Sequence, residues 1–434
     1  MDASLIAIIG LVGMFLLMAS GLPIAIAMLA AGLIGNAVLL SPTAATHLIA
    51  SNLWEQFSAY GLSVIPLFVL MGQLAYHGGI TERLYRAAYH WVGQFPGGLA
   101  ATTIAASAGF SAICGSNSAT TATMGTIALP EMRRYAYAPA MSAGAVAVGG
   151  TLGVMIPPSV VLIVIAVQTE QSLLRLFLAT LVPGLLLTVL LIATAMAICA
   201  VQPAMGPRGP VASWAQRLRS LSGVVETLLL FGLVIGGLYL GLFTPTEAAA
   251  AGAFGALVIG VARGKLGLTA IRKAVEETLR LSAMVVLMIA GAVVFGRFLT
   301  VSRLPFALAD WAASLPVAPA VILLVVVVIY LIGGAIMDAL GFLVVTLPIF
   351  FPLALALGYD PTWFTVLITI VTTLGAITPP VGVNVFIVRA MSPEIPVATI
   401  FRGVGYFIAS YAVCIALIWQ WPQFVLWLPG TASP

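Results

Sequence analysis

Charged residues are scarce in this chain of 434 residues: Asp, Glu, Lys and Arg together make up 7%, whereas soluble globular domains have about 25%. Hydrophobic residues make up 62%, and the mean hydropathy is +1.17. A chain with so few charged residues cannot cover a water-exposed surface with charged side chains. The composition therefore indicates an all-α polytopic membrane protein.

Cysteine and histidine are also scarce, with three of each. Cys114, Cys199 and Cys414 lie in apolar stretches without the spacing of metal ligands. The chain has neither a Walker A motif nor a dinucleotide-binding fingerprint, so we expect no cofactor and no ATP hydrolysis. The net charge of +4 comes from the loops, where it indicates membrane orientation and not nucleic-acid binding.

Apolar runs of the length that spans a bilayer, about 17 to 25 residues, recur along the chain. They cover 4–20, 22–40, 61–77, 178–201, 222–240, 244–262, 280–299 and 403–421. The first run follows Asp2 without a preceding Lys or Arg, so we expect a span and not a cleaved signal peptide. Shorter, interrupted segments lie between the runs, at 97–130, 139–168, 318–356 and 361–391.

Two of these segments contain consecutive prolines, Pro157-Pro158 and Pro379-Pro380, each preceded by a Thr-Leu-Gly sequence. Consecutive prolines remove backbone donors and disfavour helix in the preceding residue, so each predicts a broken helix. Within a bilayer, broken backbone is tolerated only where protein or a water-filled cavity satisfies it, and paired breaks indicate a binding site.

A constant offset of 222 residues, from Thr151 to Thr373, also relates other landmarks of the chain. It maps Pro23 to Pro245, Pro130 to Pro352, Tyr137 to Tyr359 and Pro139 to Pro361. We therefore predict two homologous repeats, 1–201 and 222–434, joined by a cytoplasmic connector at 202–221.

Each repeat contains a predicted re-entrant hairpin, at about 97–130 and about 318–356. The first has a run of polar residues at its tip, 115–118, between two short apolar arms. Close helix packing through small residues is the alternative, but consecutive polar residues cannot share one packing face. The offset places Asp338 opposite Ser116, and a carboxylate inside the membrane indicates a functional site.

The basic residues predict that the second repeat is inverted relative to the first. The linker 41–60 has no Lys or Arg, whereas the equivalent segment 263–280 has five. By the positive-inside rule the first lies outside and the second inside. This assignment puts 14 of the 17 cations inside, all except Arg175, Arg297 and Arg303, and both termini outside. We expect the amphipathic stretches 81–91 and 302–313 to be interfacial helices.

Four motifs resemble the large membrane (M) subunit of tripartite ATP-independent periplasmic (TRAP) transporters, within the ion transporter superfamily. They are Gly115-Ser-Asn-Ser-Ala-Thr120, Ile156-Pro-Pro-Ser159, Phe243-Thr-Pro-Thr-Glu-Ala-Ala249 and Ile377-Thr-Pro-Pro-Val-Gly-Val-Asn384. Their order and spacing match over essentially the whole chain. One departure is Asn117, where the family tip is more often Gly-Ser-Ser.

This resemblance implies an elevator-type transporter in the bacterial inner membrane, so the termini that the basic residues place outside would lie in the periplasm. It implies sodium-coupled uptake of a small organic acid, a carboxylate or sulfonate, delivered by a periplasmic solute-binding protein. No additional domain precedes the large-subunit pattern, so we expect a separate small membrane subunit as partner. Na⁺ is the expected coupling ion, and no other metal is expected.

The resemblance also implies where the ions and the substrate bind. The first sodium site would comprise Ser116, Asn117, Ser118, Gly153, Ile156 and Pro157, and the second Gly334, Asp338, Gly375, Thr378 and Pro379. Substrate would contact Asn117, Thr120, Thr378 and Asn384. Unwound carbonyls suit a small hard cation such as Na⁺. We expect Gly375 to adopt dihedral angles that other residues avoid.

Two other functions remain open from the sequence. A stand-alone sodium-coupled carboxylate carrier of the same superfamily would need neither a binding protein nor a small subunit. A more remote alternative is an intramembrane hydrolase that uses Ser116 or Ser118. Its base would have to come from His47, His77 or His90, which all fall in or near predicted surface linkers, so we expect no catalytic residue.

The inverted topology can be tested by labelling from one side of the membrane. Because 41–60 and 202–221 are predicted on opposite faces, Ser51→Cys and Ser213→Cys should react with an impermeant thiol reagent from opposite sides. Labelling of both positions from the same side of sealed vesicles would contradict the inverted repeat.

Overall fold

The computed structural model describes residues 3–431, and these residues form helices without a single strand. The first half comprises α1 (Ala3–Ala19), α2 (Ile24–Leu39), α3 (Pro42–Ser58), α4 (Val64–His77), α5 (Ile80–Val92), α6 (Gly98–Cys114), α7 (Asn117–Arg134), α8 (Pro139–Met155), α9 (Val160–Thr169) and α10 (Leu173–Val201). The second half comprises α11 (Trp214–Phe231), α12 (Gly237–Tyr239), α13 (Pro245–Ala262), α14 (Leu268–Val301), α15 (Leu304–Ser314), α16 (Pro319–Ile336), α17 (Ala339–Ala356), α18 (Pro361–Gly375), α19 (Val383–Met391), α20 (Val397–Gly405), α21 (Ile408–Gln420) and α22 (Gln423–Leu426).

Eight helices among residues 3–431 are long and apolar enough to cross a bilayer, or nine if α20 and α21, bent by 43°, count as one span. The chain is therefore an all-helical multi-pass membrane protein, as predicted. The linker 41–60 differs from expectation, because most of it forms α3, whose Ser41 side chain caps the helix. Likewise the span predicted at 280–299 is only the second part of α14, a helix of 34 residues.

Equivalent helices of the two halves begin at positions 222 residues apart. Helix α7 begins at residue 117 and α17 at 339, and α8 begins at Pro139 and α18 at Pro361. Proline suits the first helical position because its missing N–H would have no partner there. The prolines thus fix the same helix starts in both halves. The inverted orientation stays a prediction.

Two extensive helix contacts join one half to the other. Helix α2 of the first half packs against α14 of the second half. Their equivalents pack in the same way, α13 of the second half against α4 of the first. At the first crossing a Cβ atom on Gly32 would lie 2.9 Å from the Phe295 backbone nitrogen. Only glycine permits this approach, which is how small residues bring membrane helices together.

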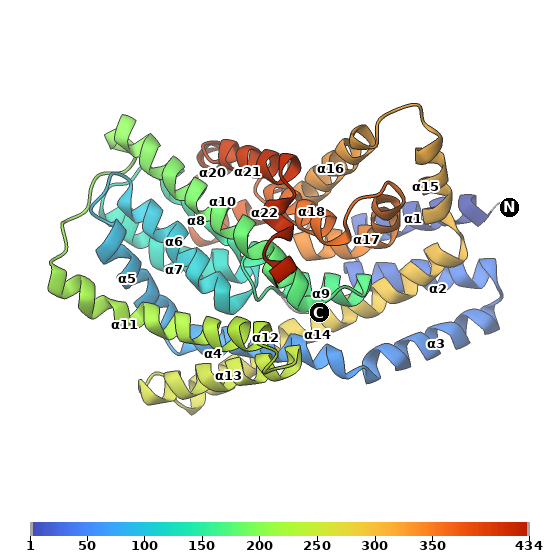
Figure 1. The fold of residues 1–434 in the computed structure, drawn as a ribbon, viewed down its shortest axis with the longest axis horizontal. Coiled ribbons are helices and arrows are strands. Elements are labelled where there is room, and N and C mark those ends of the chain that lie inside the picture. Colours follow the sequence, from blue (N-terminus) through green and yellow to red (C-terminus); the bar gives the residue numbers. More distant parts are fainter. Residues whose placement is uncertain (1–2, 432–434) are drawn as a thin grey trace.

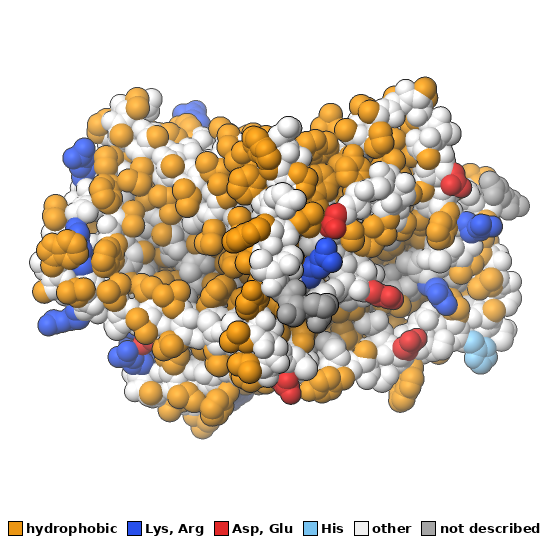
Figure 2. Space-filling view, viewed as in Figure 1, with side chains coloured by type: hydrophobic (Ala, Val, Ile, Leu, Met, Phe, Trp, Pro, Cys, Tyr) orange, Lys and Arg blue, Asp and Glu red, His pale blue; other side chains and the backbone are white. Residues whose placement is uncertain are grey.

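Figure 1 shows the two hairpins on opposite sides of the molecule, α6–α7 at the left and α16–α17 at the right. Helices α4 and α14 run along the lower part of the same view, below both hairpins. Figure 2 shows apolar side chains over most of this face, with Lys and Arg gathered at its left edge, near the start of α11. An apolar exterior is what contact with lipid requires.

The α2–α14 crossing predicts a difference between two glycines. Gly32→Val should place a side chain against the α14 backbone and lower the unfolding free energy by about 1 to 3 kcal/mol. Gly13→Val is the matched control, because a Cβ atom on Gly13 meets nothing within 4 Å. Thermal unfolding in detergent should separate the two variants. Equal midpoints would show that the crossing does not require close contact.

Candidate functional site

The first hairpin tip is joined to the first broken helix through backbone. The chain turns at Gly115 in a left-handed conformation, and Ser116 caps α7 by accepting a hydrogen bond from the Ala119 N–H. The Gly115 carbonyl accepts from the Val160 N–H, at the start of α9, at 3.1 Å. A Cβ atom on Gly153 would lie 2.4 Å from the Ser116 carbonyl oxygen. Helix α8 therefore touches the tip directly.

The second tip repeats this arrangement. The Ala335 carbonyl accepts hydrogen bonds from the Val381 and Gly382 N–H groups, at 3.1 and 2.9 Å, just after the proline pair. A Cβ atom on Gly375 would lie 2.6 Å from the Gly334 carbonyl carbon. Gly375 is the last residue of α18 and has no positive φ. The prediction of unusual dihedral angles at Gly375 is therefore wrong, and close backbone contact is the reason for glycine.

Both tips line one cavity of about 150 Å³. The first tip contributes Ser116, Asn117 and Ser118, and the second contributes Asp338, Ala339 and Leu340. Helices α4 and α14 form the facing wall, through residues including Gln73 and Met284. The starts of α7, α9 and α17 all reach this cavity. The N-terminal end of a helix attracts negative charge, because its first N–H groups lack partners in the helix.

Asp338 has a structural partner at this site. Its side chain caps α17 by accepting a hydrogen bond from the Leu340 N–H at 3.1 Å. The carboxyl group therefore lies at the wall of the tip cavity, across from the first tip. A bound anion would meet its negative charge unless a cation or proton were also present.

The four predicted substrate contacts differ in their surroundings. Asn117 is 4% exposed and lines the tip cavity, and neither of its amide atoms has a hydrogen-bond partner. Asn384 is fully buried and donates to the Ala147 carbonyl of α8 at 2.9 Å. Thr120 is buried beside the Cys114 thiol. Thr378 donates its hydroxyl to the Gly375 carbonyl at 3.0 Å. Asn117 alone among these four lines the cavity.

Other predicted ion-site residues lie at the breaks but not at the cavity. Pro157 and Pro379 each precede the second proline of a cis pair, and neither lines the tip cavity. The Ile156 side chain lies toward α10, where a Cβ atom on Gly184 would be 3.2 Å from it. These three residues could take part in ion binding only through backbone carbonyls.

The sequence analysis missed Gln73, a half-buried residue of α4. Gln73 lines the tip cavity and also a second cavity of about 300 Å³, which reaches Thr126 and Met391. Those two residues line a third cavity of about 810 Å³, which extends to Arg133 and Arg134. An amide within an apolar span was the available signal. The three cavities share lining residues from the tips to the arginines.

Histidine is absent from the walls of the tip cavity. The Nε2 atom of His77 lies 3.2 Å from the Oε2 atom of Glu277. His90 lines a different cavity, and His47 is exposed on α3. Within residues 3–431, no group of three His, Cys, Asp or Glu side chains could hold a metal ion. Ser116 and Ser118 therefore have no histidine base in this cavity for the hydrolase alternative.

The sequence matches the family model described as "Tripartite ATP-independent periplasmic transporter, DctM component" over residues 11–424. The chain belongs to this family. It is 37% identical to the C4-dicarboxylate TRAP transporter large permease protein DctM of Pseudomonas aeruginosa over 396 residues, which cover 91% of each chain. It is 33% identical to the sialic acid TRAP transporter large permease protein SiaM of Vibrio cholerae, covering 90% and 91%.

A solved structure shares the fold of this TRAP permease. The YdaH transporter of Alcanivorax borkumensis superposes with a TM-score of 0.63 at 16% identity, covering 89% of this chain and 90% of the other. The two relatives from Pseudomonas aeruginosa and Vibrio cholerae are both named as large permease proteins of transporters.

The two asparagines should respond differently to truncation. Asn117→Ala removes amide atoms without partners, so stability should change by no more than about 0.5 kcal/mol, while uptake falls. Asn384→Ala loses the bond to Ala147 and should cost about 1 kcal/mol. Thermal unfolding and proteoliposome uptake of both variants test this. Normal uptake by a destabilised Asn117→Ala protein would assign Asn117 a packing role.

Proposed function

We propose that this permease imports a small organic acid across the bacterial inner membrane, with Na⁺ as the coupling ion. The observation that carries the proposal is the tip cavity, where the starts of α7, α9 and α17 meet beside the unpartnered Asn117 amide. The starts of α7 and α9 favour an anion, whereas the start of α17 already holds the Asp338 carboxylate. The relatives named for C4-dicarboxylate and sialic acid take carboxylates, which fits this electrostatic environment.

The coupling ion follows from charge balance. An organic anion in the tip cavity lies near Asp338, so a cation lowers the repulsion between the two carboxylates. Carbonyl oxygens at the breaks, around Gly153 to Ile156 and Gly375 to Thr378, are ligands that suit Na⁺. We place one ion between each tip and the break of its own repeat.

Movement of the substrate follows an elevator mechanism in this proposal. The moving unit comprises both hairpins with the broken helices, and α2, α4, α13 and α14 form the scaffold against which it moves. The cavities beyond Gln73 lead toward Arg133 and Arg134, on the face that the basic residues predict to be cytoplasmic. The conformation then corresponds to an inward-facing state.

Two partners complete the proposed system, a periplasmic solute-binding protein and a small membrane subunit. Membership of the TRAP family supports both. Uptake in proteoliposomes should therefore require all three components. Full uptake by the permease alone would favour the stand-alone carrier.

The coupling site predicts a change in sodium dependence. Gly375→Val should push the break away from Gly334, at a cost of about 1 to 3 kcal/mol. If this cost falls on ion binding, the sodium concentration for half-maximal uptake should rise roughly 5- to 150-fold. Asp338→Asn should raise it too, because it removes a charge and keeps the size of the side chain. The affinity of the binding protein for the substrate should stay unchanged.

Gly405→Val is the control, since a Cβ atom on Gly405 meets nothing within 4 Å. Uptake should be measured across a sodium series in proteoliposomes with all three components, and again with a proton gradient alone. Wild-type uptake that follows the proton gradient and ignores sodium would contradict the proposal. Unchanged sodium dependence in both Gly375→Val and Asp338→Asn would rule out this placement of the ion.

A further inference from the structure

A basic cavity of about 240 Å³ lies between α5 and α11, away from the tip cavity. Arg83, Arg86 and His90 line it from α5, and Arg219 lines it from α11. No Asp or Glu side chain is among its lining residues. Its walls therefore gather positive charge without a matching acid.

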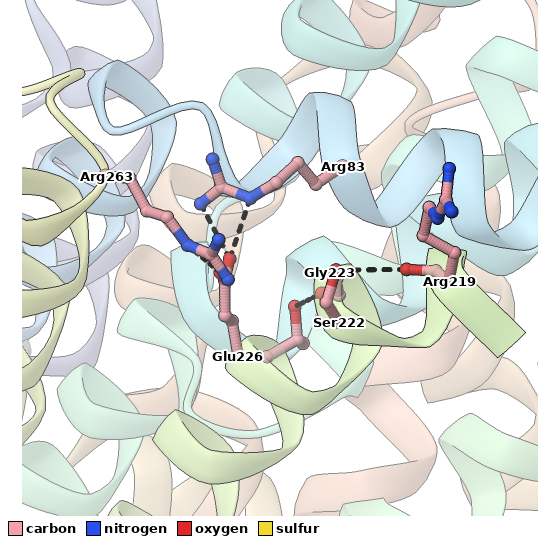
Figure 3. Close-up of polar contacts among 7 residues, drawn as sticks. Arg83, Arg219, Ser222, Gly223, Glu226 and Arg263 are labelled. Atoms are coloured by element: carbon pink, nitrogen blue, oxygen red, sulfur yellow. Dashed lines mark hydrogen bonds and ion pairs between the residues drawn. The ribbon is translucent and has the colours of Figure 1, made fainter.

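The two helices that form this cavity are held together by packing and by one buried acid. A Cβ atom on Gly223 would lie 2.7 Å from the Arg83 carbonyl oxygen, so α5 and α11 touch through backbone. Glu226, buried at 6% exposure, accepts from the Nε atoms of Arg83 and Arg263, each at 2.8 Å. Figure 3 shows both arginines meeting at Glu226, with the Arg219 side chain apart from this cluster.

Arg86 and Arg219 are left for another partner. Both are exposed, and neither takes part in an ion pair among residues 3–431. Glu226 is shared between the other two arginines, so it does not offset their charge. The cavity thus presents two free guanidinium groups, the kind of donor that binds phosphate oxygens through paired hydrogen bonds.

The position of the cavity relates it to the membrane surface. Helix α11 opens the candidate span Trp214–Tyr239, so its first turns lie at one end of that span. Trp214 packs against Trp91 with ring centroids 6.4 Å apart, and the Arg217 guanidinium lies 5.1 Å from the Trp214 ring. Tryptophan and arginine concentrate at membrane interfaces. The end of a membrane span is where lipid headgroups are expected.

Helix α11 also has a lipid-facing surface beyond the cavity. Val225, Leu228 and Leu229 of α11 are 48%, 59% and 62% exposed. At about 100° per residue they lie on another side of the helix from the cavity residues Arg219 and Gly223, so the helix that lines the cavity is itself in contact with lipid.

We propose that this cavity binds the phosphate of an anionic phospholipid from the cytoplasmic leaflet. Basic cavities between membrane helices on the cytoplasmic side suit such headgroups. The bound lipid would join α5, which leads into the first hairpin, to α11 in the second repeat. It would therefore stabilise the contact between these two helices.

The test uses the purified full-length chain in mixed micelles with phosphatidylglycerol or phosphatidylcholine of identical acyl chains. Phosphatidylglycerol should raise the thermal unfolding midpoint of the wild type, and phosphatidylcholine should not. Arg86→Gln/Arg219→Gln should need roughly 30-fold more phosphatidylglycerol for the same increase, since each interfacial arginine contributes about fivefold.

Arg272→Gln/Lys273→Gln is the control, because it removes two exposed cations from α14 and gives the same net charge. It should respond like the wild type. An equal loss in both double variants would mean general charge attraction and would overturn the site. Inorganic phosphate that stabilises the wild type in phosphatidylcholine micelles as strongly as phosphatidylglycerol does would assign the cavity to a free anion and overturn the lipid proposal. If the two lipids gave the wild type the same unfolding midpoint, the lipid proposal would also be overturned.

Discussion

Backbone groups without a helical partner cannot be left in contact with hydrocarbon, because each costs several kcal/mol there. This constraint determines the centre of the permease. The Gly115 carbonyl at one tip is satisfied by Val160, and the Ala335 carbonyl at the other by Val381 and Gly382. Each hairpin must therefore stay against the broken helix of its own repeat. The starts of α7, α9 and α17 then lie at the cavity between the tips.

The two repeats depend on each other for the rest of their packing. Helices α2 and α14, and equally α4 and α13, join opposite halves, while Asn384 of the second half donates to α8 of the first. Because helices of each half pack against helices of the other, the two similar sequences form a single scaffold and a single site. If one half were isolated, the helix faces that pack against the other half would be exposed.

The sequence predicts this architecture where local chemistry decides it. Prolines mark the starts of α8 and α18, and the proline pairs mark both breaks. Two features depend on contacts between distant segments and could not be predicted: the wall that α4 and α14 add to the tip cavity, and the backbone contact that requires glycine at Gly375. Helix α3 was missed for another reason. Its sequence is too polar to resemble a span, although its serine cap was visible.

Relative movement between the tips and the scaffold is the central claim, and cross-linking tests it most directly. In a chain with its native cysteines replaced by alanine, Ser118→Cys and Met284→Cys put thiols on the tip and on α14, at one cavity. Gly125→Cys and Met391→Cys put them on α7 and α19, which are in contact within the proposed moving unit. We predict that a short bifunctional thiol reagent stops uptake reversibly in the first pair and leaves it intact in the second. Full uptake by the cross-linked first pair would contradict the elevator movement.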